Sequence, residues 1–252
     1  EPGQSVNCIV NELDNGLDML LRLPDHPDID FRERLAAFAD EQDVARLSYH
    51  AAGDTLTDPV PLAQRRTPAI TFGPVSVTPP PGAFLQATVD GEAAIQQLVR
   101  DGTEGARSVL DLYAGCGTLC FALDDSAERL AVEGDDGLLT ALRAGADAAR
   151  LGDRVRTERR DLTQRPFADK ELGAFDAVVL DPPRAGAREQ AAALATSGVQ
   201  RIVYVSCNPA TFARDARTLV DGGYDCLEVT PIDQFLWTSH IELVAHFVRR
   251  GA

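Results

Sequence analysis

From residue 88 to residue 248, short apolar runs alternate with segments of helical periodicity, and this alternation limits the folds open to the chain. Strands that alternate with helices of about 10–15 residues predict a parallel sheet with helices on both faces. The segment between the runs SVLDLY and RLAVEG is predicted to form a glycine turn followed by a helix. The last two runs, CLEVTPI and IELVAHFV, have no helix between them, which predicts an antiparallel hairpin at the sheet edge.

The first 85 residues have a different pattern and predict a small α+β subdomain. SVNCIVNEL and GLDMLLRL flank Asp14-Asn15-Gly16, a strong hairpin signal. DFRERLAAFADEQ has helical spacing, and ARLSYHA has the composition of another strand. The stretch from Asp58 to Pro81 is rich in proline and is predicted to be a stiff connector. We therefore predict two domains, residues 1–85 with the connector and residues 86–252 with the parallel sheet.

The net charge of −15 counts against a general nucleic-acid-binding surface, which should be basic. Clusters of arginine occur at Arg65-Arg66, between Arg154 and Arg165, and at Arg249-Arg250, and each is most simply a solvated face. No apolar run approaches the roughly 18 residues of a membrane helix, so we expect no membrane partner. The first residues, EPGQSVNCIV, lack the features of a secretory signal.

The five cysteines are scattered, and their spacing fits neither a disulfide framework nor a zinc ribbon. Cys116 and Cys120 form a C-x3-C pair without a second pair, which favours two packing residues. We therefore expect no metal site and a cytoplasmic protein, because a reducing compartment suits unpaired thiols.

A glycine turn follows the first strand of the predicted parallel sheet, in DLYAGCGT. Gly115 and Gly117 allow the backbone to turn tightly and to approach a ligand at a helix N-terminus. Glu133 ends the second strand, where a carboxylate can accept hydrogen bonds from ribose hydroxyls. The two features indicate a nucleoside-containing cofactor, and they do not separate NAD from S-adenosylmethionine.

Asp181-Pro182-Pro183-Arg184 closes a later strand and holds Asp181 at the carboxyl edge of the sheet. A structural turn explains it, but it also resembles the (D/N)-P-P-(Y/F/W) loop of methyltransferases that act on exocyclic amines. Those enzymes stack the base on an aromatic fourth residue, and Arg184 stands there in this chain.

A cysteine stands beyond the end of the next strand, in YVSCNPATFARD. A packing cysteine would lie inside the apolar run, whereas Cys207 follows it, in a loop that Asn208 and Pro209 restrict. Ligands meet side chains at this position in open α/β sheets.

The order of these motifs resembles the RNA uracil-5-methyltransferases, over essentially the whole chain. The resemblance rests on Phe84-Leu85-Gln86, DLYAGCGT, AVEGD, LDPPRAG, YVSCNPATFARD and HIELVAHF. It implies a Rossmann-like class I methyltransferase sheet in residues 86–252, S-adenosylmethionine as cofactor, and 5-methyluridine formation in ribosomal or transfer RNA. We expect a monomer with an RNA substrate.

The resemblance also assigns roles to individual residues. Cys207 matches the nucleophile that adds to C6 of uracil, and Glu242 matches the base that removes the C5 proton. Phe84 matches an aromatic residue that stacks on RNA bases, although a core phenylalanine would look the same. The remaining matches, to residues that hold S-adenosylmethionine, are Gln86, Tyr113, Glu133 and Asp181, together with the turn at Gly115 and Gly117; Asp181 also matches a contact to the uracil edge.

Three departures from the family pattern stand out. Thr88 occupies a position where the family often has asparagine. The N-terminal oligonucleotide-binding β-barrel has no counterpart in the sequence, which agrees with the acidic charge if another segment holds the RNA. Some members bind an iron–sulfur cluster through four cysteines, but Cys8 has no partners nearby, so we expect no cluster.

Two alternatives remain open at this stage. The chain could methylate another nucleobase, at cytosine C5 or at an exocyclic amine. It could also be a non-catalytic RNA-binding module that has kept the fold, although the presence of both Cys207 and Glu242 argues against this alternative.

Overall fold

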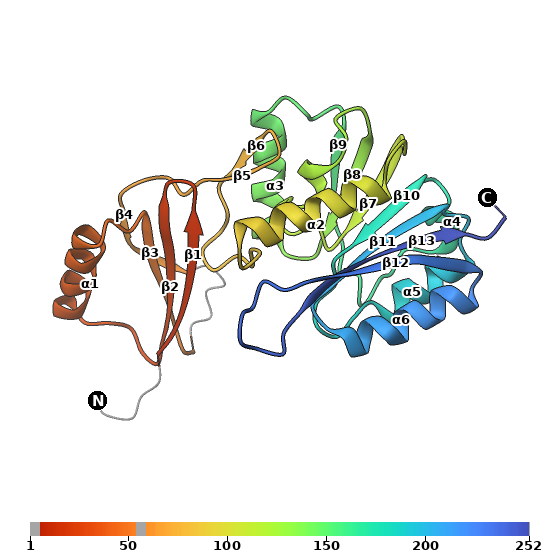
Figure 1. The fold of residues 1–252 in the computed structure, drawn as a ribbon. Coiled ribbons are helices and arrows are strands. Elements are labelled where there is room, and N and C mark those ends of the chain that lie inside the picture. Colours follow the sequence, from red (N-terminus) through yellow and green to blue (C-terminus); the bar gives the residue numbers. More distant parts are fainter. Residues whose placement is uncertain (1–5, 54–58, 252) are drawn as a thin grey trace. The chain divides into compact units, whose positions relative to one another are not determined.

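A computed structural model describes residues 6–53 and 59–251, and the chain contacts divide it into two compact units (Figure 1). The small unit comprises residues 1–71 and 76–85, and the large unit comprises residues 72–75 and 86–252. That the two units are separately folding domains with a boundary near residue 85 remains a prediction.

The small unit is built on a four-stranded sheet with the order β1-β2-β3-β4. The predicted hairpin is present, since Leu13 pairs with Gly16 at its turn. Helix α1 connects β2 to β3, which run parallel. The elements are β1 (Asn7–Leu13), β2 (Gly16–Leu23), α1 (Ile29–Glu41), β3 (Arg46–Ala51) and β4 (Val60–Gln64).

The prediction of a stiff connector after residue 58 was wrong for most of its length. Asp58 lies outside the described residues, and the stretch from residue 60 contains three strands: β4, β5 (Ile70–Phe72) and β6 (Val75–Val77). Pro61 pairs with Ser48 within β4. Proline cannot donate a hydrogen bond to a neighbouring strand, but β4 is an edge strand, where this loss is tolerated.

The large unit contains the predicted parallel sheet, with the strand order β12-β13-β11-β10-β7-β8-β9. Its strands are β7 (Ser108–Leu112), β8 (Glu128–Glu133), β9 (Val155–Arg159), β10 (Ala177–Leu180), β11 (Arg201–Ser206), β12 (Tyr224–Ile232) and β13 (Glu242–Arg249). The predicted hairpin β12–β13 is antiparallel, and β12 forms the sheet edge. The chain builds the sheet outward from β7 in one direction and then returns to add β10 on the other side. The carboxyl ends of β7 and β10 therefore mark the point where ligands bind in such sheets.

Helices cover both faces of this sheet (Figure 1). Ile95 and Val99 of α2 pack on one face with Val179 and Val203. Helices α5 and α6 cover the other face, in a core that includes Leu194 of α5. The helices are α2 (Val89–Gly102), α3 (Asp136–Ala148), the short α4 (Asp169–Leu172), α5 (Arg188–Thr196) and α6 (Pro209–Asp221).

The helix predicted after the glycine turn is absent, and only a single 3₁₀ turn forms there, at Cys120–Ala122. The cause is the buried Arg129 of β8, whose guanidinium donates to the carbonyls of Cys120, Leu123 and Asp124. A helix would need these carbonyls for its own hydrogen bonds. The glycine turn therefore does not lead into an α-helix.

A buried ion pair in the small unit provides a test of the two-unit division. Both oxygens of the Asp18 carboxylate accept from Arg46 at 2.7 Å, and Arg46 also donates to the carbonyl of Pro79. Asp18→Ala leaves a buried guanidinium without its partner and should cost about 3–5 kcal/mol. We expect hydrogen exchange to accelerate in β1–β4 and to stay unchanged in β7–β13.

Asp40→Ala is the matched control, because Asp40 is an exposed partner of Arg65 in the same unit. Exposed pairs contribute only about 0–1 kcal/mol. Equal acceleration of exchange in both units of Asp18→Ala would contradict the division.

Candidate active site

The site is built where β11 ends and β13 begins, and the pairing register of the two strands determines which side chains meet. Ser206 pairs with Leu243, the last pair of the ladder. Continued by one residue, the antiparallel register sets Cys207 opposite Glu242. Cys207 is half-buried and Glu242 is only 2% exposed. The two residues predicted to be catalytic, 35 positions apart in the sequence, are thus brought together.

The loop that carries Cys207 is fixed from both sides. Ser206 Oγ accepts from the backbone N–H of Asn208. The Asn208 side chain caps α6 by accepting from the N–H of Ala210, and Pro209 occupies the first turn of the helix. The Asn208 amide also donates to the carbonyl of Arg184 at 2.9 Å, which joins this loop to the one after β10.

The Asp181-Pro182-Pro183-Arg184 loop is held against α6 by a second set of contacts. Thr211 Oγ1 donates to the Arg184 carbonyl. Asp215 is buried and accepts from the N–H of Ala187 and from the Tyr204 hydroxyl, both at 2.8 Å. The Arg184 side chain lies 3.4 Å from Nδ1 of His240. No aromatic residue occupies the fourth position, and Arg184 is paired there with a histidine.

Three acidic groups at this edge have raised pKa values, each chiefly because it is buried. Burial raises the pKa of Asp181 to about 7. Burial, and then the charge of Asp181, raise the pKa of Glu242 to about 7. The pKa of the Cys207 thiol is raised by burial and by the charges of Glu242 and Asp181, with Arg184 acting in the opposite direction. These influences on the pKa favour the protonated thiol of Cys207.

The glycine turn lies at the end of β7 and has an unusual backbone. Tyr113 and Gly115 both have positive φ, of 63° and 56°. A Cβ built on Gly115 would meet nothing within 4 Å, whereas one on Gly117 would strike the Phe121 ring. Gly117 is therefore required by packing. Gly115 is required by its conformation alone, and its outer side is open to a ligand.

Glu133 lies at the end of β8 and organises this turn. Its Oε2 accepts from the N–H of Gly115 at 2.9 Å, and its Oε1 accepts from the N–H groups of Gly134 and Asp135. A carboxylate oxygen has two lone pairs, so ribose hydroxyls can still donate to it. Glu133, predicted to contact the cofactor, therefore also holds the backbone of the glycine turn, a role that the sequence did not reveal.

Gln86 and Thr88 lie just before α2. Gln86 Oε1 accepts from the side-chain amide of Gln234 at 2.7 Å, so its own amide remains available as a donor. Thr88 caps α2 by accepting from the N–H of Gly91, a role that the asparagine often present in the family could also fill. Phe84 belongs to the small unit and is 72% exposed, which disfavours a core role.

Asp111 in β7 is a site residue that sequence analysis missed. It is fully buried, and its carboxylate lies near the backbone N–H of Cys120 without making a hydrogen bond of normal geometry. Burial, and then the charges of Asp181 and Glu133, raise its pKa well above the usual range. The sequence alone does not distinguish a buried aspartate in an apolar strand from an aspartate that is exposed at the surface.

The arrangement fits a nucleoside cofactor that carries a positive charge. Glu133 accepts from the N–H of Gly115 in the open glycine turn, Asp181 follows β10 beside β7, and Asp111 is a buried acid within β7. Such a set suits a cationic group better than a pyrophosphate, which needs positive or N–H-rich surroundings. The described residues contain no group of three His, Cys, Asp or Glu side chains that could hold a metal ion.

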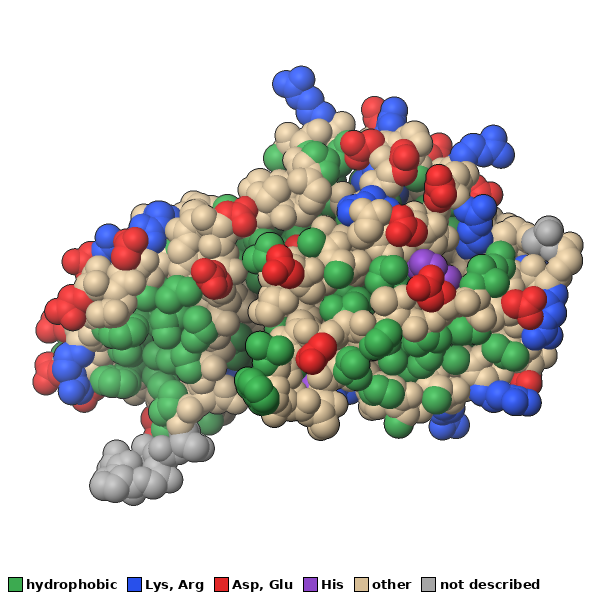
Figure 2. Space-filling model, in the orientation of Figure 1, with side chains coloured by type: hydrophobic (Ala, Val, Ile, Leu, Met, Phe, Trp, Pro, Cys, Tyr) green, Lys and Arg blue, Asp and Glu red, His purple; other side chains and the backbone are tan. Residues whose placement is uncertain are grey.

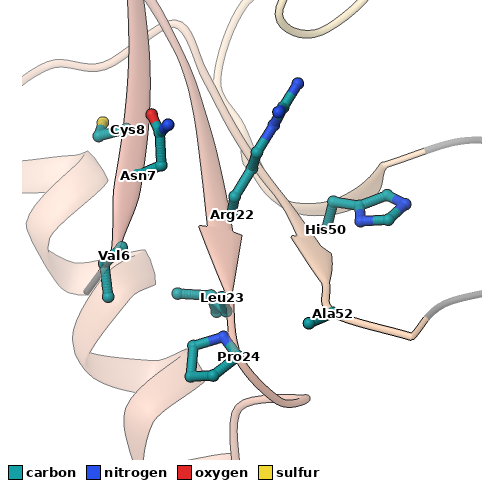
Figure 3. Close-up of a pocket in the computed structure, with 8 residues that line it drawn as sticks. All are labelled: Val6, Asn7, Cys8, Arg22, Leu23, Pro24, His50 and Ala52. Carbon is teal, nitrogen blue, oxygen red and sulfur yellow. The ribbon is translucent and has the colours of Figure 1, made fainter. Parts of the chain in front are cut away.

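A cavity of ≈ 570 Å³ lies apart from these residues, in the small unit. Its lining includes Cys8, Arg22 and His50 (Figure 3). Figure 3 shows that Cys8 and Arg22 point in different directions from neighbouring strands, so the cavity has no convergent set of reactive groups.

The surface charge bears on a nucleic-acid partner, and the length and polarity of the helices bear on a membrane partner. On the face that Figure 2 shows, acidic and basic side chains are interspersed over the large unit, without a continuous basic track. No helix within residues 6–53 and 59–251 is long and apolar enough to cross a membrane.

Comparison with known proteins gives a consistent picture. Residues 153–250 match the family model described as tRNA (Uracil-5-)-methyltransferase. An uncharacterized RNA methyltransferase of Mesorhizobium japonicum is 51% identical over 184 residues, which cover 73% of this chain and 45% of the relative. The 23S rRNA (uracil(1939)-C(5))-methyltransferase RlmD of Aeromonas salmonicida is 35% identical, over 94% of this chain and 54% of the relative. The chain spans about half the length of these curated relatives.

The fold also has counterparts among solved structures. The tRNA (uracil-54, C5)-methyltransferase of Pyrococcus abyssi, in complex with S-adenosyl-L-homocysteine, superposes with a TM-score of 0.73. The superposition covers 95% of this chain and 58% of the other, at 22% identity. The predicted Rossmann-like methyltransferase fold is confirmed.

Residues 153–250 therefore belong to the tRNA (uracil-5-)-methyltransferase family, and the chain is a homologue of proteins named RNA methyltransferases.

Proposed function

We propose that this chain is the catalytic part of an S-adenosylmethionine-dependent RNA methyltransferase that forms 5-methyluridine in ribosomal or transfer RNA. The observation that carries the proposal is Cys207 opposite Glu242, at the carboxyl edge where an open glycine turn and Asp181 also lie. The relatives named above act, by their names, on RNA, and the Aeromonas relative acts on uracil C5 in 23S rRNA.

In the proposed mechanism, Cys207 makes uracil C5 nucleophilic. The thiolate forms a bond to C6, and the electrons of the C5=C6 double bond shift to give an enolate. S-adenosylmethionine, when bound, supplies the electrophilic methyl group that C5 attacks. Glu242 then takes the C5 proton, the C5=C6 double bond re-forms, and the bond between C6 and sulfur breaks to release Cys207.

Gln86, Tyr113, Glu133 and Asp181, with the turn at Gly115 and Gly117, are proposed to hold the cofactor. Phe84 is proposed to stack on RNA, and Asp181 also to contact the uracil edge. A uracil in folded RNA must leave its stack to reach the site, at a cost of a few kcal/mol.

We further propose that residues 1–85 form a subdomain of this enzyme and that it acts as a monomer in the cytoplasm. All five cysteines are free thiols, which supports a reducing compartment.

The covalent protein–RNA products of two variants distinguish the role of Cys207 from that of Glu242. Cys207→Ala should abolish methyl transfer and any covalent protein–RNA species. Glu242→Gln should permit addition and methyl transfer but stall release, because the amide cannot take the C5 proton. A denaturing gel with RNA from cells that lack the gene, and with labelled cofactor, should show a shifted, labelled band for Glu242→Gln alone. An adduct in Cys207→Ala would identify another nucleophile, and normal methylation with no adduct in any variant would indicate transfer to a heteroatom.

The proton affinity of Cys207 should depend on Glu242 and can be measured without substrate. Removing the negative charge with Glu242→Gln should lower the thiol pKa, because like charges disfavour ionisation. The readout is the pH dependence of alkylation by iodoacetamide, with Cys8 and Cys226 replaced by serine because both are exposed. Glu104→Gln, an exposed position, is the charge-matched control. A midpoint that stays or rises in Glu242→Gln would contradict the proposed proximity.

Glu133 should contribute to cofactor affinity both directly and through the turn. Glu133→Ala removes charge-assisted hydrogen bonds worth roughly 1.5–3 kcal/mol, so affinity for S-adenosylhomocysteine should fall about tenfold or more. Calorimetry measures this, with Asp136→Ala, an exposed acid three residues on, as the control. Unchanged affinity would remove Glu133 from the cofactor site, and binding of NAD by the parent protein would exclude the proposed cofactor.

A further inference from the structure

The loop between β12 and β13 (Figure 1) comprises Asp233–Ile241 and exposes two large apolar side chains. Trp237 is 100% exposed and Leu236 is 71% exposed. Trp237 also has a φ of 65°, a left-handed conformation that is costly for a bulky residue. Packing does not explain the tryptophan, and its backbone is strained. A backbone outlier of this kind points to a functional constraint.

Hydrogen bonds fix the loop on both sides of Trp237, so the indole projects from a defined backbone. Gln234 is buried and donates to Gln86, one of the proposed cofactor residues. On the other side, Thr238 Oγ1 donates to the carbonyl of Phe235 and accepts from the N–H of His240.

The same loop leads directly into the candidate active site. His240 lies edge-on to the Phe235 ring, with ring centroids 6.1 Å apart, and its Nδ1 is 3.4 Å from the Arg184 guanidinium. Glu242 follows two residues later. A fully exposed aromatic ring and an exposed guanidinium therefore belong to the elements that bound the site where a uracil would react.

An unpaired nucleobase is the occupant that this chemistry favours. Every base presents a π-face to an indole, and guanidinium groups stack on bases as well. A base also becomes available when the target uridine is drawn out of the RNA stack.

We propose that Trp237 stacks on an unpaired RNA base beside the target uridine and so contributes to RNA binding. This inference rests on the proposed function, since it assumes that RNA enters the site.

The experiment uses fluorescence and kinetics together, because Trp237 is the only tryptophan in the chain. Stacking on a base should quench its emission in a saturable manner. The probe is deproteinised total RNA from cells that lack the gene, with free N-acetyltryptophanamide correcting for absorption by RNA. Trp237→Ala should raise KM for this RNA by about 5- to 100-fold while kcat is retained, since one base stack contributes that much affinity. Trp237→Phe should restore most of the affinity.

Leu227→Ala is the matched control, because Leu227 is 67% exposed in β12 and lies outside the loop. It should leave KM unchanged. An unquenched Trp237, or a KM unchanged in Trp237→Ala while methylation proceeds, overturns the stacking inference alone. Quenching that depends on protein concentration without RNA identifies a second copy of the chain as the occupant and also overturns it. Absence of both methyl transfer and a Cys207 adduct would instead refute the proposed function, and the fluorescence titration would still decide the stacking.

Discussion

Antiparallel pairing of β11 with β13 sets Ser206 against Leu243, and the chemistry at this edge depends on that register. A slip of one residue would turn Glu242 to the opposite face of the sheet. The register is well determined because both faces are buried. Val205 and Val244 pack on the side of α2, and Tyr204 and Ala245 pack on the side of α6. The apolar core thus positions two polar groups that it does not itself contain.

The same edge holds acidic groups whose burial works against folding at neutral pH. Asp181 and Glu242 have pKa values raised to about 7, so the folded state binds their protons more tightly than the unfolded chain does. Their contribution to stability is therefore greatest below the pKa of an unfolded carboxyl and is lost as the pH rises towards and through 7. The hydrogen bonds that tie Asn208 and Thr211 to the loop after β10 fix this edge of the sheet despite the cost of burying the carboxyls. A site that keeps such strain at neutral pH is typical of function rather than of stability.

Sequence analysis predicted the order of strands and helices in the large unit because periodicity and strand-end motifs are local properties. It also brought Cys207 and Glu242 to one edge, through motif resemblance rather than through geometry. It failed where a distant side chain decided the outcome. Arg129 donates to the carbonyls after the glycine turn, and no local sequence pattern predicts these hydrogen bonds.

The same limit explains the other differences. The proline-rich stretch forms strands because β4 lies at an edge, which is a property of the assembled sheet. The unpaired burial of Asp111 and the full exposure of Trp237 depend on where neighbouring elements end. The roles assigned to individual site residues remain predictions, because proximity shows what can react and not what does.

The raised proton affinities also shape the proposed reaction. Cys207 starts as a thiol and must lose a proton before it adds to C6, and the C5 proton must leave later. Glu242 lies opposite Cys207 and could accept the first proton, but it would then be unable to accept the second until it had passed the first one on. Asp181 has a pKa close to that of Glu242, and its charge acts on both Glu242 and Cys207. A second carboxyl with a raised pKa gives this edge another group that can accept a proton. The acidic pair therefore suits a reaction with separate addition and elimination steps better than a direct transfer, which has one proton to remove.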